Sequence, residues 1–344
     1  MIYDSIIDTI GRTPVVRLNR LTTANGAEIL VKLEGHNPAG SVKDRTALSM
    51  VLRAERDGRL KPNGTIIESS SGNTGKGLAM IGAALGYRVI IVTDPKAPRS
   101  MVDYVTAIGA ELEVVQTPDE TGYQRPRLNR LRELLAETPG SFWPNQYDNP
   151  DNPRVHAEQT AHELLEDVPT FDALVVAVGT GGHISGLSAT VKQALPDVTT
   201  IGVDAKGSVA FGFPYGGWQM RGLGIAWKPG NLHPEVVDEV HLVTDEEGIA
   251  TTRLLARLEG LMVGESSGAA VFGALHYAHR HPGSRIVAVS PDNGTNYLGE
   301  SYDDRWLDEH GLGEGVSKLN GLEQLVDAAR EPACAPVRLT HSRR

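Results

Sequence analysis

A lysine beside small residues is the first group in this sequence that could do covalent chemistry. Lys43 lies two residues after Ser41 in segment 37–45, which reads NPAGSVKDR. Ser41 has the character of a helix N-cap, which predicts Lys43 in the first helical turn, where a cation opposes the helix dipole. That position disfavours the charged amine, and a neutral amine is the form that makes a Schiff base. The alternative for such a lysine, taken alone, is a solvated surface residue.

A glycine-rich turn supplies a candidate phosphate site. It lies between an apolar strand and a helix and consists of Gly179, Thr180, Gly181 and Gly182. Glycines let the backbone approach an anion closely, and successive N–H groups at a helix N-terminus bind phosphate. A tight turn without a ligand is the alternative. Nucleotide loops fit less well, because the third glycine of G-x-G-x-x-G would fall on Ile184 and no G-K-[S/T] ending follows.

Two other strand-to-helix junctions carry hydroxyl groups. Segment 68–75, ESSSGNTG, offers hydroxyls, one amide and helix N-terminal N–H groups, which suit an α-carboxylate; the alternative is a serine-rich cap and turn. Segment 264–268, GESSG, precedes an alanine-rich helix. A serine facing a pyridine nitrogen shares a hydrogen bond without protonating the ring, which suits elimination and replacement better than transamination. Here the alternative is a helix cap.

These motifs need a scaffold that brings strand ends together. Apolar, β-branched runs predict strands at 29–33, 65–68, 87–92, 111–115, 173–178, 200–204 and 285–289. Helices are predicted between them at 44–57, 75–85, 99–108, 127–137, 154–166 and 183–194. This alternation predicts an α/β fold with mostly parallel sheets covered by helices, and such folds bind ligands beyond the carboxyl ends of their strands.

Bulk composition narrows the function classes. The 344 residues favour two domains, and a net charge of −10 disfavours nucleic acid and anionic membranes as partners. The single cysteine, Cys334, can form neither an internal disulfide nor a cysteine metal cluster, so no metal site is expected and a cytoplasmic location is favoured. No signal peptide and no apolar run of about 20 residues is visible.

Together, in this order and spacing, the four motifs resemble the fold type II pyridoxal-5′-phosphate (PLP) enzymes of the cysteine synthase and cystathionine β-synthase family, from Ile10 to about Leu307. The resemblance implies Lys43 as the Schiff-base lysine and proton shuttle. It implies cofactor contacts from Asn73, Gly179, Thr180, Gly181, Gly182, His183 and Ser266. It implies substrate contacts from Ser70, Ser71, Thr74, Gln146 and Gly222. Amino-acid substrates and a homodimer are likewise implied.

The same resemblance implies a two-domain, tryptophan synthase β-like architecture. Residues 1–43 and 149–330 are expected to form a large PLP-binding domain, and residues 44–148 a small mobile domain that closes on the substrate carboxylate. Residues 331–344 are expected to form a poorly ordered tail. The implied reaction replaces the β-substituent of an O-activated L-serine through an aminoacrylate intermediate, which domain closure shields from water.

Several stretches are closest in appearance to the N-(2-amino-2-carboxyethyl)-L-glutamate synthases of siderophore-type 2,3-diaminopropionate pathways: residues 92–96, 122–127, 203–212, 291–294, 297–298 and 304–307. That likeness implies O-phospho-L-serine and L-glutamate as substrates, with Arg127 and Tyr147 as candidates for recognising the diacid. Arg127 also belongs to a basic run on one predicted helix, so a solvated face is its alternative.

Other features keep the substrates open. The Gly-Thr-Gly-Gly loop is similar to that of cysteine synthases, which use sulfide, and His183 stands where a small hydroxyl is common. The leaving group can be phosphate or acetate, and homocysteine or aspartate are further nucleophiles, the former giving a cystathionine β-synthase. A catalytically silent PLP-binding protein, a β-eliminating dehydratase and a nucleotide-binding oxidoreductase are the alternatives in other classes.

Overall fold

The computed structural model describes residues 2–120 and 122–340, which divide into two compact units. The first comprises the chain up to Gly11 together with Asn37–Val155, and the second comprises Arg12–His36 and the chain from His156 onward. The division expected from the sequence, with residues 1–43 and 149–330 in the larger domain, differs from this one at residues 1–11, 37–43 and 149–155, which belong to the first unit. Local contacts account for the difference: the amide of Gly11 donates to Asn37 Oδ1 at 2.8 Å, and α5 (Asp151–Val155) packs on α1 (Lys43–Arg56).

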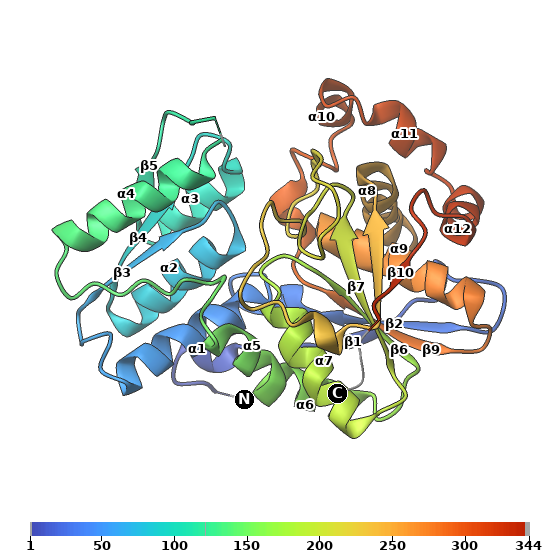
Figure 1. The fold of residues 1–344 in the computed structure, drawn as a ribbon, viewed down its shortest axis with the longest axis horizontal. Helices are drawn as coiled ribbons and strands as arrows, with labels where there is room; N and C mark the ends of the chain where they lie inside the picture. Colours follow the sequence, from blue (N-terminus) through green and yellow to red (C-terminus); the bar gives the residue numbers. More distant parts are fainter. Residues whose placement is uncertain (1, 121, 341–344) are drawn as a thin grey trace. The chain divides into compact units, whose positions relative to one another are not determined.

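A three-stranded parallel sheet forms the centre of the first unit (Figure 1). Its order is β3 (Thr65–Ser69), β4 (Arg88–Thr93) and β5 (Glu111–Val114). Successive strand residues enter different apolar clusters: Ile66 packs with residues of α1 and α2, whereas Ile67 packs with Leu131 of α4. Both faces are therefore covered, as expected for a parallel sheet. The other elements are η1 (Ile6–Thr9), α2 (Asn73–Leu85), α3 (Arg99–Ala107) and α4 (Gln124–Glu137).

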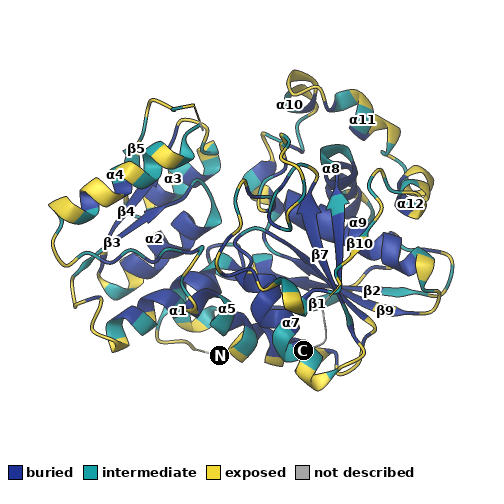
Figure 2. Ribbon diagram, viewed as in Figure 1, coloured by how far each residue is buried: buried dark blue, intermediate teal, exposed yellow. Residues whose placement is uncertain are grey.

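The second unit is built on a seven-stranded sheet in the order β1-β2-β9-β6-β7-β8-β10. The five inner strands pair in parallel and are dark blue, hence buried, over most of their length in Figure 2. They are β2 (Glu28–Leu33), β9 (Arg285–Ser290), β6 (Ala173–Ala177), β7 (Thr199–Ala205) and β8 (Glu239–Val243). The two edge strands, β1 (Val15–Arg17) and β10 (Val337–Arg338), pair antiparallel.

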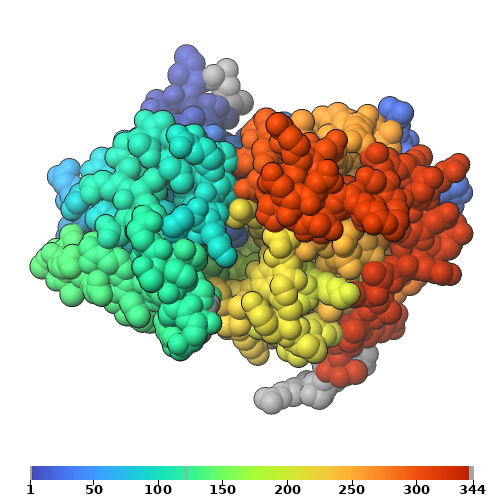
Figure 3. Space-filling view, turned by 90° about the horizontal axis from the view of Figure 1, so that it is seen from above, coloured from blue at the N-terminus to red at the C-terminus, as the bar shows by residue number. Residues whose placement is uncertain are grey.

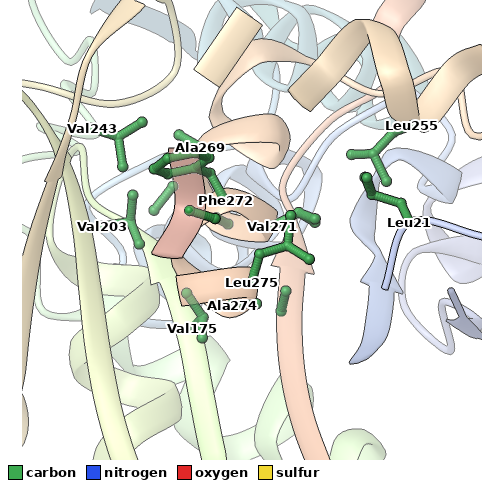
Figure 4. Packing of buried hydrophobic residues seen from close by; sticks show 14 of the residues in the cluster. Leu21, Val175, Val203, Val243, Leu255, Ala269, Val271, Phe272, Ala274 and Leu275 are labelled. Carbon is green, nitrogen blue, oxygen red and sulfur yellow. The ribbon is translucent and has the colours of Figure 1, made fainter. Parts of the chain in front are cut away.

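Helix α9 (Glu265–Arg280) carries much of the core of the second unit. Figure 4 shows its apolar residues, including Phe272, beside Val175 and Val203 of the sheet. The other elements are η2 (Glu34–His36), the π-helical η3 (His156–Thr160), α6 (Ala161–Asp167), α7 (Gly182–Ala194), η4 (Pro234–Val236), α8 (Asp245–Leu254), the π-helical η5 (Leu255–Glu259), η6 (Gly294–Tyr297), α10 (Asp304–Glu309), α11 (Gly313–Lys318) and α12 (Leu322–Arg330).

The predicted α/β class with mostly parallel, helix-covered sheets is confirmed, and each predicted strand and helix lies at or within a few residues of an observed element. The helix predicted at 154–166 is interrupted by the π-helical turn η3. The expectation of a poorly ordered tail is wrong for residues 331–340. There β10 pairs with β8, and the amide of Ala333 donates to Glu247 Oε1 at 2.9 Å; Figure 3 shows this C-terminal segment in red on the surface of the second unit. Residues 341–344 lie outside the described residues.

Within the described ranges, no helix combines the length and apolar character needed to cross a membrane.

Candidate functional site

Lys43 is the first residue of α1, which confirms its predicted place in the first helical turn. Val42, and not Ser41, is the N-cap residue. The hydroxyl of Ser41 still accepts the Lys43 amide at 3.1 Å, and the carboxylate of Asp44 accepts the amide of Ala39 at 2.6 Å. These two bonds fix the backbone around Lys43 by local hydrogen bonding.

Asn73 is the first residue of α2, which packs on α1. Gly77 permits the close approach, because a Cβ atom there would lie 3.3 Å from the carbonyl oxygen of Lys43 and 3.4 Å from Cβ of Ala47. The N-terminal turns of the two helices are thus neighbours, and the structure holds the backbones of Lys43 and Asn73 on one framework.

The serine-rich loop between β3 and α2 is held by its own side chains. Ser70 Oγ accepts the amides of Gly72 and Gly75 at 3.2 and 3.1 Å, so this hydroxyl serves the turn, as the cap interpretation expected. Thr74 Oγ1 donates to Gln146 Oε1 at 2.7 Å. Two of the predicted carboxylate-binding residues therefore meet although 72 positions separate them in sequence.

A buried acid lies directly beneath this loop. Glu68, at 2% exposure, accepts the amide of Ser69 at 2.9 Å, the indole N–H of Trp143 at 3.1 Å and the amide of Gln146 at 3.3 Å. Burial raises its pKa to about 7, against the hydrogen bonds, which lower it. Sequence reasoning missed Glu68; the available signal was a charged residue at the end of an otherwise apolar strand.

Arg127 lies on α4 and points to the same loop. Its guanidinium pairs with Asp94 at 2.9 Å, and its side chain is 15% exposed. It also donates to the hydroxyl of Ser71, while its Nε–H is buried without a hydrogen-bond partner among the described residues. The solvated-face interpretation is therefore wrong for Arg127. It holds for Arg125, which is half exposed and pairs with surface acids.

Tyr147, the other residue suggested for diacid recognition, interacts electrostatically with Arg127 and Glu68. Burial raises the pKa of its hydroxyl to about 12; the positive charge of Arg127 opposes the rise and the negative charge of Glu68 adds to it. The phenol is consequently neutral near pH 7 and serves as a hydrogen-bonding group.

In the second unit, the glycine turn follows β6 and leads into α7, whose N-cap is Gly181. Gly181 has φ +81°, and a Cβ atom there would lie 2.6 Å from Cα of Leu232. Only glycine suits both the conformation and the space. The first amides of a helix have no intrahelical acceptor, so the N-terminus of α7 has the geometry that suits an anion.

Gly264 is the N-cap of α9, so segment 264–268 does cap this helix, and Ser266 itself lies in the first helical turn. Its side chain is fully buried, and Oγ has no hydrogen-bond partner in the described structure. Gly222, at φ +83°, lies against it, since a Cβ there would be 2.9 Å from Ser266 Oγ. Gly222 also approaches the glycine turn, because a Cβ on Gly179 would be 3.3 Å from the carbonyl oxygen of Gly222.

These features fit PLP. The helix N-terminus suits its phosphate, the unpaired Ser266 hydroxyl suits a ring nitrogen, and glycines leave the space free. Thr180 lies in the same turn and is buried. His183, in the first turn of α7, is also buried, with its ring 4.6 Å from that of His156. It therefore fills the helix start against a second imidazole.

The comparisons agree with this assignment. Residues 6–292 match the family model described as pyridoxal-phosphate dependent enzyme. A probable cysteine synthase of Bacillus subtilis is 42% identical over 85% of this chain and 94% of the relative. An N-(2-amino-2-carboxyethyl)-L-glutamate synthase of Cupriavidus metallidurans is 39% identical over 94% of this chain and 96% of the relative. A crystal structure of cysteine synthase from Entamoeba histolytica superposes with a TM-score of 0.85, 33% identity and 97% of each chain covered.

The chain therefore belongs to the pyridoxal-phosphate dependent enzymes, as a fold type II, β-substituting member of the cysteine synthase family.

Proposed function

We propose that this enzyme joins the β-carbon of an O-activated L-serine, O-phospho- or O-acetyl-L-serine, to the amine of an amino acid such as L-glutamate. The observation that carries the choice of nucleophile is Arg127. It is a largely buried guanidinium beside the serine loop, and its Nε–H has no hydrogen-bond partner within residues 2–120 and 122–340. A second carboxylate would satisfy this donor, whereas sulfide would leave it unused.

In this proposal, a small set of residues binds the cofactor and one of them transfers the proton. Lys43 would bind PLP covalently, Asn73 and Ser266 would contact its ring, and the amides of the 179–182 turn would hold its phosphate. PLP, when bound, withdraws electrons from the substrate's α-carbon. Lys43 Nζ then takes the proton from that carbon as the β-substituent leaves. Gly222 lies beside the substrate amine.

The substrate carboxylate is assigned to the serine loop. Ser71, Thr74 and the N-terminal amides of α2 are its donors, Ser70 shapes the turn, and Gln146 orients Thr74. Arg127 keeps Ser71 in place and offers its free Nε–H to the incoming nucleophile. Because Asp94 already neutralises Arg127, we expect a modest preference for a diacid over a neutral amino acid.

The relative from Cupriavidus metallidurans supports this nucleophile, because its similarity covers 94% of the chain, against 85% for the Bacillus subtilis protein. A cysteine synthase using sulfide is the second candidate. The observations that favour it are the Gly-Thr-Gly-Gly turn and the higher identity, 42% against 39%, of the Bacillus protein.

One experiment decides between them. The purified holoenzyme is incubated with O-acetyl-L-serine or O-phospho-L-serine and with sulfide, L-glutamate, L-aspartate or L-homocysteine, and products are identified by mass spectrometry. The N-linked glutamate adduct is the expected product. Dominant cysteine formation would refute the amine nucleophile, and a protein that borohydride cannot fix to PLP at Lys43 would refute the whole assignment.

We also propose a cytoplasmic homodimer, which light scattering and fractionation would test.

A further inference from the structure

We propose that Glu68 is a positioning residue for the substrate α-carboxylate, and that amino-acid substrates bind to the form of the enzyme in which Glu68 is ionised. The inference rests on the proposed function, which places that carboxylate at the serine loop. Glu68 itself touches neither substrate nor cofactor in this proposal; it acts through the backbone of the loop and of Gln146.

Glu68 joins the two segments that make the carboxylate site. Oε1 accepts the amide of Ser69, where the serine loop begins, and Oε2 accepts the amide of Gln146. The side chain of Gln146 returns to the loop by accepting from Thr74 at 2.7 Å and donating to the Ser69 carbonyl at 3.5 Å. One carboxylate therefore closes a ring of hydrogen bonds around the donors assigned to the substrate.

The hydrogen-bond partners of Glu68 select its ionised form. They are N–H donors: the amides of Ser69, Asn145 and Gln146 and the indole of Trp143. An ionised carboxylate only accepts and can satisfy several donors at once, whereas a protonated one directs an O–H at them. Asn145 also has φ +50°, a left-handed conformation that the surroundings must hold in place.

Burial and the charged groups around Glu68 determine the pH range in which this arrangement is lost. Burial raises its pKa to about 7, and the neighbouring Tyr147 stays neutral because its own pKa is raised to about 12. Arg127 is the nearby cation and is neutralised by Asp94. As the pH falls through 7, Glu68 takes up a proton, and its carboxyl group then accepts fewer hydrogen bonds from the surrounding N–H groups. The serine loop and Gln146 are then no longer held together. Carboxylate binding weakens in the same range.

The test compares two probes on the holoenzyme, L-serine and ethanolamine. Both carry a primary amine and a hydroxyl, but only L-serine has the carboxylate. Dissociation constants are measured from the change in cofactor absorbance between about pH 5.5 and 8.5, a range that spans the titration of a group near pH 7. Dividing the ethanolamine constant by the L-serine constant removes effects of amine and cofactor titration. We expect this ratio to fall about tenfold per pH unit below about pH 7, because each unit lowers the ionised fraction of Glu68 about tenfold.

A variant pair separates positioning from general structure. Glu68→Gln should lower the ratio at least about tenfold and make it independent of pH, because an amide accepts at one oxygen only. Glu55→Gln is the control: Glu55 accepts from Tyr87, outside this ring of bonds, and its replacement should leave the ratio unchanged. Emission of Trp143, assigned with Trp143→Phe, should titrate near pH 7 in the native holoenzyme and not in Glu68→Gln.

The outcomes are distinguishable. If the native enzyme binds both probes equally at all pH values, the carboxylate site itself is wrong. If it prefers L-serine but the preference is independent of pH, or grows as the pH falls, the Glu68 inference is wrong while the proposed function stands. The native pH series decides this point even where Glu68→Gln does not fold.

Discussion

Replacing Gly181 by alanine tests the phosphate turn most directly. The substitution adds a single methyl group at the N-cap of α7, where φ is +81°. That methyl carbon would lie 2.6 Å from Cα and 2.7 Å from the amide nitrogen of Leu232. The backbone of Leu232 has little freedom to retreat, because its amide donates to the Pro229 carbonyl and the next amide, of His233, donates to Ser185 Oγ on α7.

The expected cost has two parts. A left-handed conformation costs a non-glycine residue about 1–2 kcal/mol, and a methyl group forced against packed atoms costs about 1–3 kcal/mol more. Gly181→Ala should thus lower the free energy of unfolding by about 2–5 kcal/mol. Gly283→Ala is the matched control, because Gly283 has φ +77° with no atom within 4 Å of the added carbon, so it should show only the first part.

Thermal unfolding of both variants, followed by circular dichroism, measures the difference. For a unit of this size each 1 kcal/mol lowers the Tm by about 2–4 °C. The affinity for PLP, measured by reconstituting the cofactor-free protein, should fall at least about tenfold in Gly181→Ala and be unchanged in Gly283→Ala, since only the former turns the phosphate-binding amides. Equal melting temperatures and equal affinities for the two variants would refute the reasoning about this turn.

Two further predictions concern buried groups of the second unit. Ser266→Ala should leave the stability of the cofactor-free protein within about 0.5 kcal/mol, because the lost Oγ has no partner in the part of the chain that the structure describes. It should nevertheless weaken PLP binding severalfold, and a large loss of stability without cofactor would contradict the assignment. Burial lowers the pKa of His241 to about 3, with contributions from His276 and Arg280, whereas in the unfolded chain it is about 6.5. The unfolded state thus binds the proton first, so His241 contributes a slope to stability against pH: a loss of about 1.4 kcal/mol per unit as the pH drops below about 6.5. His241→Phe should reduce this slope, and an unchanged slope in denaturation at several pH values would contradict it.

The sequence predicts the fold well where its signal is local. Strand 285–289 and helix 183–194 agree with β9 and α7 almost to the residue, because apolar runs and glycine turns mark their ends. The C-terminal segment shows the opposite case. Proline and charge in residues 331–340 predict disorder, but β10 gains its order from pairing with β8, almost 100 residues away in the chain.

Within the candidate site, the same distinction separates the cofactor from the substrate. The groups that fit PLP are largely backbone amides and glycines, whose positions follow from short motifs, so the cofactor class could be predicted from residues such as Gly181 and Ser266. The groups that bear on the nucleophile are side chains whose state depends on distant partners. Arg127 pairs with Asp94, 33 positions earlier, at 2.9 Å and donates to Ser71, whereas Arg125 pairs with surface acids. Since no motif encodes that pairing, substrate choice in this enzyme must be established by changing those pairs and measuring which nucleophile still reacts.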